Sequence, residues 1–148
     1  MAVNPLIALG SLNRLRGSVV IPSYPTLNVT ASFLSKRGIR MDLVGDATQQ
    51  LEAMTGVIPS PEPYMVVDVT VSLLKTNGLA AAWIAQLQLN SVLGNVTVHT
   101  DTSAYPAFNF SQCAITRLPP ESFSGDEPNA DFTFRGQYIV NNNLWALA

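Results

Sequence analysis

Hydrophobic and polar residues alternate most regularly over residues 64–74. Alternation with a period of two, rich in β-branched side chains, is typical of a strand that is buried on one face. The apolar face comprises Met65, Val67, Val69, Val71 and Leu73, and the opposite face includes Asp68, Thr70 and Ser72. We therefore predict a central strand here, buried on the side of Val69.

The hydrophobic period changes from two to 3.6 directly after this strand. Thr76, Asn77 and Gly78 interrupt the alternation, and Thr76 or Asn77 is available to cap a helix. Leu79, Trp83 and Leu87 then lie one helical turn apart. The pattern predicts one α-helix over about residues 78–89, with Trp83 as a core anchor. No other stretch is as clearly helical.

Shorter alternating segments on both sides of this unit predict further strands. They lie at residues 17–21, 27–33, 39–44, 94–101, from 108 onward, and 131–140. Residues 36–38 are predicted to be a turn, and a change of apolar face near Ala114 indicates a β-bulge. Six to eight short strands with one packed helix predict a mainly β fold, a small β-sandwich or barrel. At this length we expect a single domain over residues 1–148.

The alternating pattern fails between Gly45 and Pro63. A short helical turn over residues 46–54 is possible, and the prolines that follow argue against a strand in a ladder. A segment of this length without regular structure is long for a compact domain. We therefore expect residues 46–63 to form a long loop, residues 1–16 an N-terminal arm and residues 141–148 a C-terminal tail.

Apolar side chains in this loop suggest that it docks onto another subunit. The four that we propose for the contact are Leu51, Met54, Val57 and Ile58. The alternative is that they fold back and cover the chain's own sheet.

Charged residues make up only 12% of the sequence, against roughly 25% in a typical globular protein. Because the cores of protein interfaces are depleted in charge, we expect the chain to associate with itself. The alternative is a monomer whose surface is rich in Ser, Thr and Asn. No apolar block is long enough to span a membrane, and a net charge of −2 does not favour a nucleic-acid surface.

The sequence offers little catalytic chemistry. One His and one Cys cannot make a metal site of His and Cys ligands, and no glycine-rich phosphate loop occurs. His99, Asp101 and Ser103 share one side of a predicted strand, but no nucleophile elbow surrounds Ser103, which favours a plain polar face. We therefore predict a protein that is not an enzyme and that uses no metal or cofactor.

Four segments, taken in order, resemble the tail tube proteins of contractile-tailed bacteriophages. They are SVVIPSYPTLNVTASFL, EAMTGVIPSPEPYMVVDVTVSLLKTNGLAAAW, LGNVTVHTDT and FRGQYIVNN, within residues 17–142. The resemblance implies a structural virion protein, whose hexameric rings stack into a hollow tube that conducts DNA and the tape-measure protein. It also implies other copies of the chain, the tail sheath protein and baseplate proteins as partners, and assembly in the host cytoplasm.

A tube through which DNA slides should have a neutral polar wall with a few acids. Each contact between a basic side chain and a phosphate would strengthen DNA binding in a salt-dependent way. Polar strand faces supply Asp42, Asp68 and Asp131 as candidate lumen residues.

Two other functions stay open. One is a different virion structural protein, from a baseplate, a head–tail connector or a capsid decoration. The other is a monomeric β-sandwich binding module, which would need an exposed aromatic platform from Tyr24, Tyr64 and Tyr105.

Overall fold

The computed structural model describes residues 16–145 except 77, 103–104, 119–125 and 127. Most of the predicted N-terminal arm and the end of the C-terminal tail therefore lie outside the described residues. The strands are β1 Gly17–Val20, β2 Leu34–Val44, β3 Thr48–Ala53, β4 Gly56–Pro61, β5 Tyr64–Leu74, β6 Val92–Thr100, β7 Phe108–Arg117 and β8 Asn129–Ile139. The helices are α1 Gly78–Leu89 and α2 Asn142–Trp145, with 3-10 turns η1 Pro25–Leu27 and η2 Ala31–Phe33.

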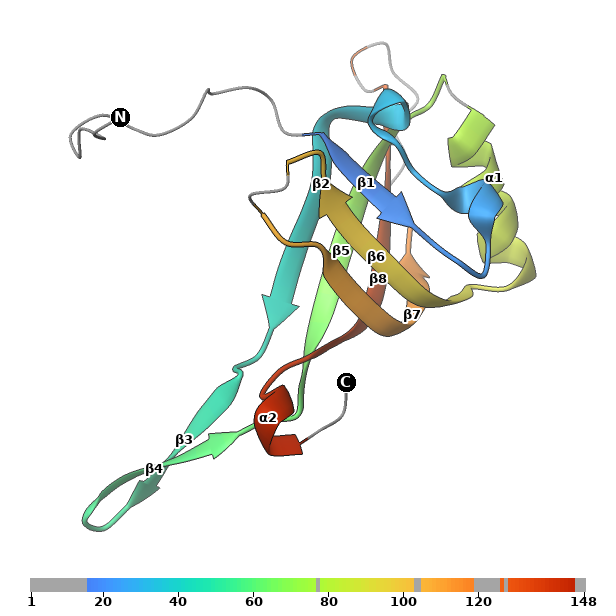
Figure 1. Ribbon diagram of the computed structural model, residues 1–148. Coiled ribbons are helices and arrows are strands. Elements are labelled where there is room, and N and C mark those ends of the chain that lie inside the picture. Colours follow the sequence, from blue (N-terminus) through green and yellow to red (C-terminus); the bar gives the residue numbers. More distant parts are fainter. Residues whose placement is uncertain (1–15, 77, 103–104, 119–125, 127, 146–148) are drawn as a thin grey trace, which may run out of the picture.

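Six of the strands form one antiparallel sheet in the order β1-β6-β7-β8-β5-β2. The sheet curls into a nearly closed barrel, with α1 against one side of it (Figure 1). Its two edge strands meet at side-chain level, because a Cβ added to Gly17 of β1 would lie 2.9 Å from Cδ1 of Ile39 on β2. The predicted mainly β fold with one packed helix is confirmed.

The core fills the inside of this barrel. Val69 is fully buried, as are its neighbours on the same face of β5, so the predicted facing of this strand is confirmed. Trp83 of α1 is also fully buried, with ring centroids 5.6 Å from Phe132 and 6.3 Å from Phe134 of β8. Its Nε1–H donates to the Leu27 carbonyl at 3.2 Å, which satisfies the one polar atom of the indole.

The predicted strand over residues 27–33 is wrong. Only Val29 pairs, through two backbone hydrogen bonds with Val19 of 2.9 and 2.8 Å, and 3-10 turns lie on both sides of it. Pro25 presets the first turn, and the Asn28 side chain accepts a hydrogen bond of 2.8 Å from the backbone N–H of Ile21. The alternation of apolar residues correctly marked Leu27 and Val29 as buried, although the backbone between them is not a regular strand.

Two irregularities in the strands differ from their predicted places. The expected turn at residues 36–38 lies inside β2, where the pairing with β5 shifts between Leu34 and Ile39 and Gly38 has a φ of 65°. The bulge expected near Ala114 is present slightly earlier in β7, at Gln112, which has a φ of 55°.

The expectation that residues 46–63 contain no paired strands is wrong as well. They form neither a helical turn nor an irregular loop but a two-stranded hairpin, in which β3 pairs with β4. The N–H of Glu62 donates to the Ala47 carbonyl at 2.9 Å, so alternate residues of β4 point their N–H groups at β3. Pro59 and Pro61 are the residues in between, so their nitrogens face the open edge of the hairpin. No hydrogen bond between the strands is lost there, although proline has no N–H to donate.

Candidate functional site

The β3–β4 hairpin extends away from the barrel, beyond the ends of β2 and β5 (Figure 1). Its large apolar side chains remain in contact with solvent: Leu51 is 50% exposed, Val57 58%, Ile58 57% and Met54 fully exposed. They therefore do not cover the chain's own sheet, which excludes that alternative. An element with this much apolar surface and no cover from the barrel is a candidate contact surface.

The pairing register assigns three of these four residues to the two faces of the hairpin. Leu51 lies directly opposite Ile58, so the two form a cross-strand apolar pair on one face. Val57 lies opposite Glu52 on the other face, and Met54 occupies the turn. The sequence identified the residues, whereas their division between faces follows from the register alone.

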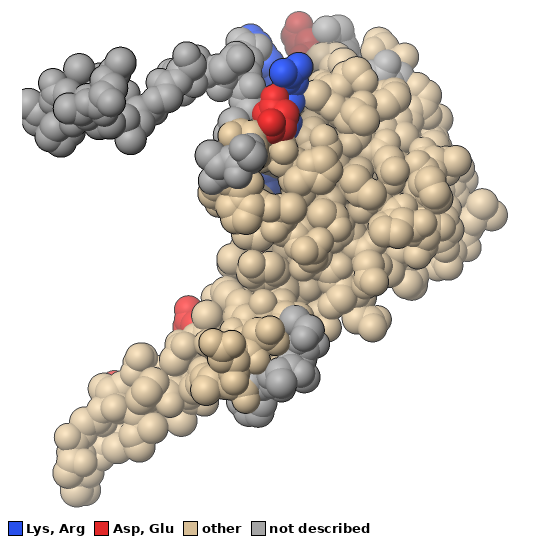
Figure 2. Space-filling view, viewed as in Figure 1, with Lys and Arg blue, Asp and Glu red and all other residues tan. Residues whose placement is uncertain are grey.

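Charged groups are scarce around the hairpin. On the face drawn in Figure 2, Lys and Arg gather at the barrel end farthest from the hairpin, and the hairpin itself shows almost no charge. The sequence contains no Lys or Arg between Met41 and Leu74. The charged residues of residues 45–63 are Asp46, Glu52 and Glu62, all acidic.

Asn141 connects the base of the hairpin to the end of β8. Its side-chain Nδ2 donates to the carbonyls of Ala47, at 3.0 Å, and of Glu62, at 2.7 Å, one on each leg of the hairpin. Its backbone has a φ of 54°, a conformation that Asn tolerates better than most residues. The hydrophobic pattern does not mark this residue, whose only signal in the sequence is an Asn directly after the predicted strand over residues 131–140. These bonds limit how far the hairpin can swing relative to the barrel.

The three predicted lumen residues lie on one outward face of the sheet, which we call the polar face. Asp42 of β2 lies opposite Asp68 of β5, which in turn lies opposite Arg135 of β8. Asp131 lies opposite Ser72 and is therefore on the same face. The structure thus places three acids that are distant in sequence on the same face of the sheet.

Each of these acids has an arginine partner. Asp68 accepts two hydrogen bonds from Arg135, of 2.6 and 3.0 Å, and Asp42 lies 3.5 Å from Nε of Arg40. Asp131 accepts hydrogen bonds from the Ser72 hydroxyl at 2.7 Å and from Arg37 at 3.3 Å.

The hydrogen bonds from Arg135, with its positive charge, lower the pKa of Asp68 despite partial burial. The same pairing raises the pKa of Arg135. Because each of its three acids has an arginine partner, the polar face is hydrophilic with nearly balanced charge.

Of the residues considered for catalysis, Asp101 is paired with Arg16. The Asp101 carboxylate accepts hydrogen bonds from Arg16, from the backbone N–H at 3.2 Å and from Nε at 2.9 Å, and this contact lowers its pKa. Ser103 lies outside the described residues. Burial raises the pKa of the Cys113 thiol to about 12, so it stays protonated.

Two further observations concern metal ligands and membrane-spanning helices. Within the described ranges, no group of three or more His, Cys, Asp or Glu residues could hold a metal ion. The described helices include none that is both long and apolar enough to cross a membrane.

The tyrosines considered as a binding platform lie in different parts of the barrel. Tyr24 accepts a hydrogen bond of 3.4 Å from Asn90, just after α1, whereas Tyr64 begins β5 beside the hairpin. Tyr105 packs on Phe108, with ring centroids 5.7 Å apart. The structure does not bring the three rings together into one platform.

Comparisons with known proteins show where this fold occurs. No protein-family model matches the sequence, and no curated protein matches it either. Among solved structures, the sheath/tube terminator of an extracellular contractile injection system, PVC, in its extended state has a TM-score of 0.51 at 18% identity, covering 91% of this chain and 96% of that one. The tube-terminating cap of the anti-feeding prophage, AFP, has a TM-score of 0.51 at 19% identity, covering 94% and 95%. The chain therefore has the fold of these tube-terminating proteins, which confirms at the level of fold its resemblance to contractile-tail tube proteins.

Proposed function

We propose that this chain is a structural subunit of the inner tube of a phage-type contractile tail. In this proposal, six copies form a ring and the rings stack into a hollow tube that conducts DNA and the tape-measure protein. The observation that carries the proposal is the hairpin: an ordered, apolar, uncovered extension of a barrel that has the fold of tube-terminating proteins.

The hairpin is the proposed contact between one ring and the next. Leu51, Met54, Val57 and Ile58 expose apolar area, and burying it against a neighbour is favourable because water is released from that area. The Asn141 hydrogen bonds and the prolines of β4 restrict the hairpin before it binds. Less conformational entropy is therefore lost on docking than for a flexible loop.

The polar face is the proposed wall of the lumen. Asp42, Asp68 and Asp131 are each next to an arginine, so the face offers water-compatible groups without a strong net charge. A wall of this kind lets the phosphate backbone pass, because few counterions are released on contact. The outside of the tube would then contact the tail sheath protein and its end the baseplate proteins. The particle would be assembled in the host cytoplasm and the subunit would reside in the virion tail.

A second candidate is a tube terminator, which forms one ring and ends the tube. The likeness to two terminating proteins favours it, since both share the fold over nearly their whole length. A terminator ring docks on the tube but does not stack on copies of itself.

Negative-stain electron microscopy of the purified chain separates these candidates. Long tubes of constant diameter are expected for a tube subunit, and isolated rings for a terminator. Featureless monomeric particles, stable on dilution from micromolar concentration, would contradict both.

A retention assay tests the proposed lumen. Assembled tubes should not hold duplex DNA tightly at any salt concentration. Strong retention that weakens steeply with salt would contradict the lumen assignment.

A further inference from the structure

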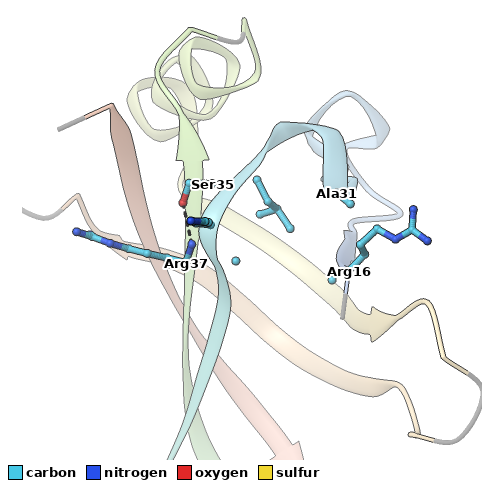
Figure 3. A pocket seen from close by; sticks show the side chains of 8 residues that line it. Arg16, Ala31, Ser35 and Arg37 are labelled. Carbon is cyan, nitrogen blue, oxygen red and sulfur yellow. Dashed lines mark hydrogen bonds between the residues drawn. The ribbon is translucent and has the colours of Figure 1, made fainter. Parts of the chain in front are cut away.

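A groove lies at the place where the barrel fails to close. It has a volume of about 690 Å³ and is bounded by the start of β1, by η2 and by the first half of β2. Figure 3 shows the gap between the β1 and β2 ribbons, with Arg16 and Ala31 on one side and Ser35 and Arg37 on the other. The lining residues are Arg16, Gly17, Ala31, Leu34, Ser35, Lys36, Arg37 and Gly38.

This groove and the hairpin lie at opposite ends of the molecule. The groove contains the first residues of β2, whereas the last residue of β2, Val44, leads into the hairpin (Figure 1). The remaining six residues of β2, 39–44, separate the groove from the hairpin segment, a length of roughly 20 Å at about 3.3 Å per residue. A surface at one end and an extension at the other are the arrangement that head-to-tail association between identical copies requires.

The two ends are also complementary in charge. The groove is bordered by the cations Arg16, Lys36 and Arg37, of which Arg16 pairs with Asp101 and Arg37 with Asp131. Lys36 is exposed and has no ion-pair partner among the residues described. The hairpin carries only acids, with Glu52 two residues from its turn. Opposite charges in these positions favour one register of docking and disfavour others.

We propose that this groove receives the hairpin tip of a second copy of the chain. The inference rests on the proposed function and adds the receiving surface to it. Met54 enters between Ala31 and Leu34, and Glu52 lies beside Lys36. Because the donor and acceptor surfaces differ, each copy offers one hairpin and one groove, and the contact repeats from ring to ring without closing.

Disulfide trapping tests this contact directly. One preparation carries Met54→Cys and a second carries Ala31→Cys, both in a Cys113→Ala background, and the two are mixed under assembly conditions and mildly oxidised. A covalent dimer between the two preparations is expected. The matched control replaces Ala31→Cys with Gln88→Cys, an exposed position on α1, and should give at least tenfold less dimer.

The outcomes distinguish this inference from the proposed function. Tubes that form normally while Met54→Cys does not crosslink to Ala31→Cys, or crosslinks equally well to Gln88→Cys, would overturn the groove assignment and leave the tube function standing. A chain that does not assemble at all would overturn both.

A charge exchange provides an independent readout. Lys36→Glu alone and Glu52→Lys alone should each shorten the tubes severalfold, because each places like charges side by side. The double variant should recover most of the length. Failure of the double variant to recover, with both single variants folded and shortened, would show that these two residues are not partners.

Discussion

The barrel wall and the hairpin contain similar apolar residues, but the barrel buries them and the hairpin exposes them. In β5, Val67, Val69 and Val71 are fully buried inside the barrel. In the hairpin, Leu51 and Ile58 form an equally regular cross-strand pair, yet both are at least half exposed. The apolar residues of the barrel are buried within one chain, whereas those of the hairpin can be buried only against a second molecule.

The energetic contrast follows from this geometry. A two-stranded hairpin is at best marginally stable in water by itself, so it depends on its anchoring at the base and on any partner. Burying the exposed halves of Leu51 and Ile58 would contribute about 2 kcal/mol per hairpin, at the usual gain for aliphatic side chains. Substitutions should therefore change folding in the barrel and assembly in the hairpin.

The largest effect on folding is expected for Val69→Asp. It places a carboxylate in the closed interior, between Met41 and Phe134 on the flanking strands, with no partner. The free energy of unfolding should fall by about 4 kcal/mol or more, measured by urea denaturation. Thr70→Asp, on the polar face, is the matched control and should change it by less than about 1 kcal/mol. Equal losses for both variants would mean that the facing of β5 is wrong.

The next largest effect is expected for Trp83→Ala. The substitution removes the packing on Phe132 and Phe134 and leaves a cavity under α1. It should cost about 3–5 kcal/mol of unfolding free energy. Leu89→Ala in the same helix, where the side chain is 85% exposed, should cost less than about 0.5 kcal/mol, so a similar loss for both would contradict the assigned core face of α1.

A smaller, pH-dependent effect is expected from the polar face. The pKa of Asp68 is lower in the folded state because of Arg135. The pair therefore stabilises the fold above the unfolded pKa of about 3.9, and its contribution disappears as the pH falls through the folded value. The contribution is about 1 kcal/mol, since water still reaches the pair.

Asp68→Asn should remove this part of the pH dependence. Urea midpoints measured from pH 2 to pH 6 should rise less steeply in the variant than in the unmodified chain. Identical slopes would show that the ion pair does not contribute to stability.

Much of the barrel could be predicted from the sequence. Periods of 2 and 3.6 placed β5 and α1 correctly, because one-sided burial imposes those periods on a strand and a helix. A strand was wrongly predicted around Val29 because alternation indicates which side chains are buried, not whether the backbone pairs with a neighbouring strand. Turns fixed by Pro25 and Asn28 produce the same alternation as a strand.

The residue pattern of 46–63 did not predict the paired strands of the hairpin, for a related reason. Its prolines argued against pairing, but a two-stranded ribbon has an open edge on each strand that accepts Pro59 and Pro61 without loss. The partnership of Asp68 with Arg135 depends on the register of two strands far apart in the sequence. Asn141 was missed because a backbone-directed side-chain contact leaves no periodic signal.

The smallest effect on folding is expected in the hairpin. Leu51→Asp combined with Ile58→Asp should change the unfolding free energy of the subunit by less than about 1 kcal/mol, because both side chains are at least half exposed and lie outside the barrel core. The matched control is Leu89→Asp with Val92→Asp, which adds the same charges at exposed apolar positions at the end of α1 and the start of β6. Light scattering should show that the hairpin variant no longer forms polymers and that the control still does.

The most direct test of the central claim is the length distribution of tubes formed after residues 47–58 are replaced by a short Gly/Ser linker. The unmodified chain should form long tubes. The linker variant should keep its thermal transition within a few degrees but form no long tubes under the electron microscope. Tubes of normal length from the linker variant, or loss of its folded state, would contradict the claim that the hairpin joins one ring to the next.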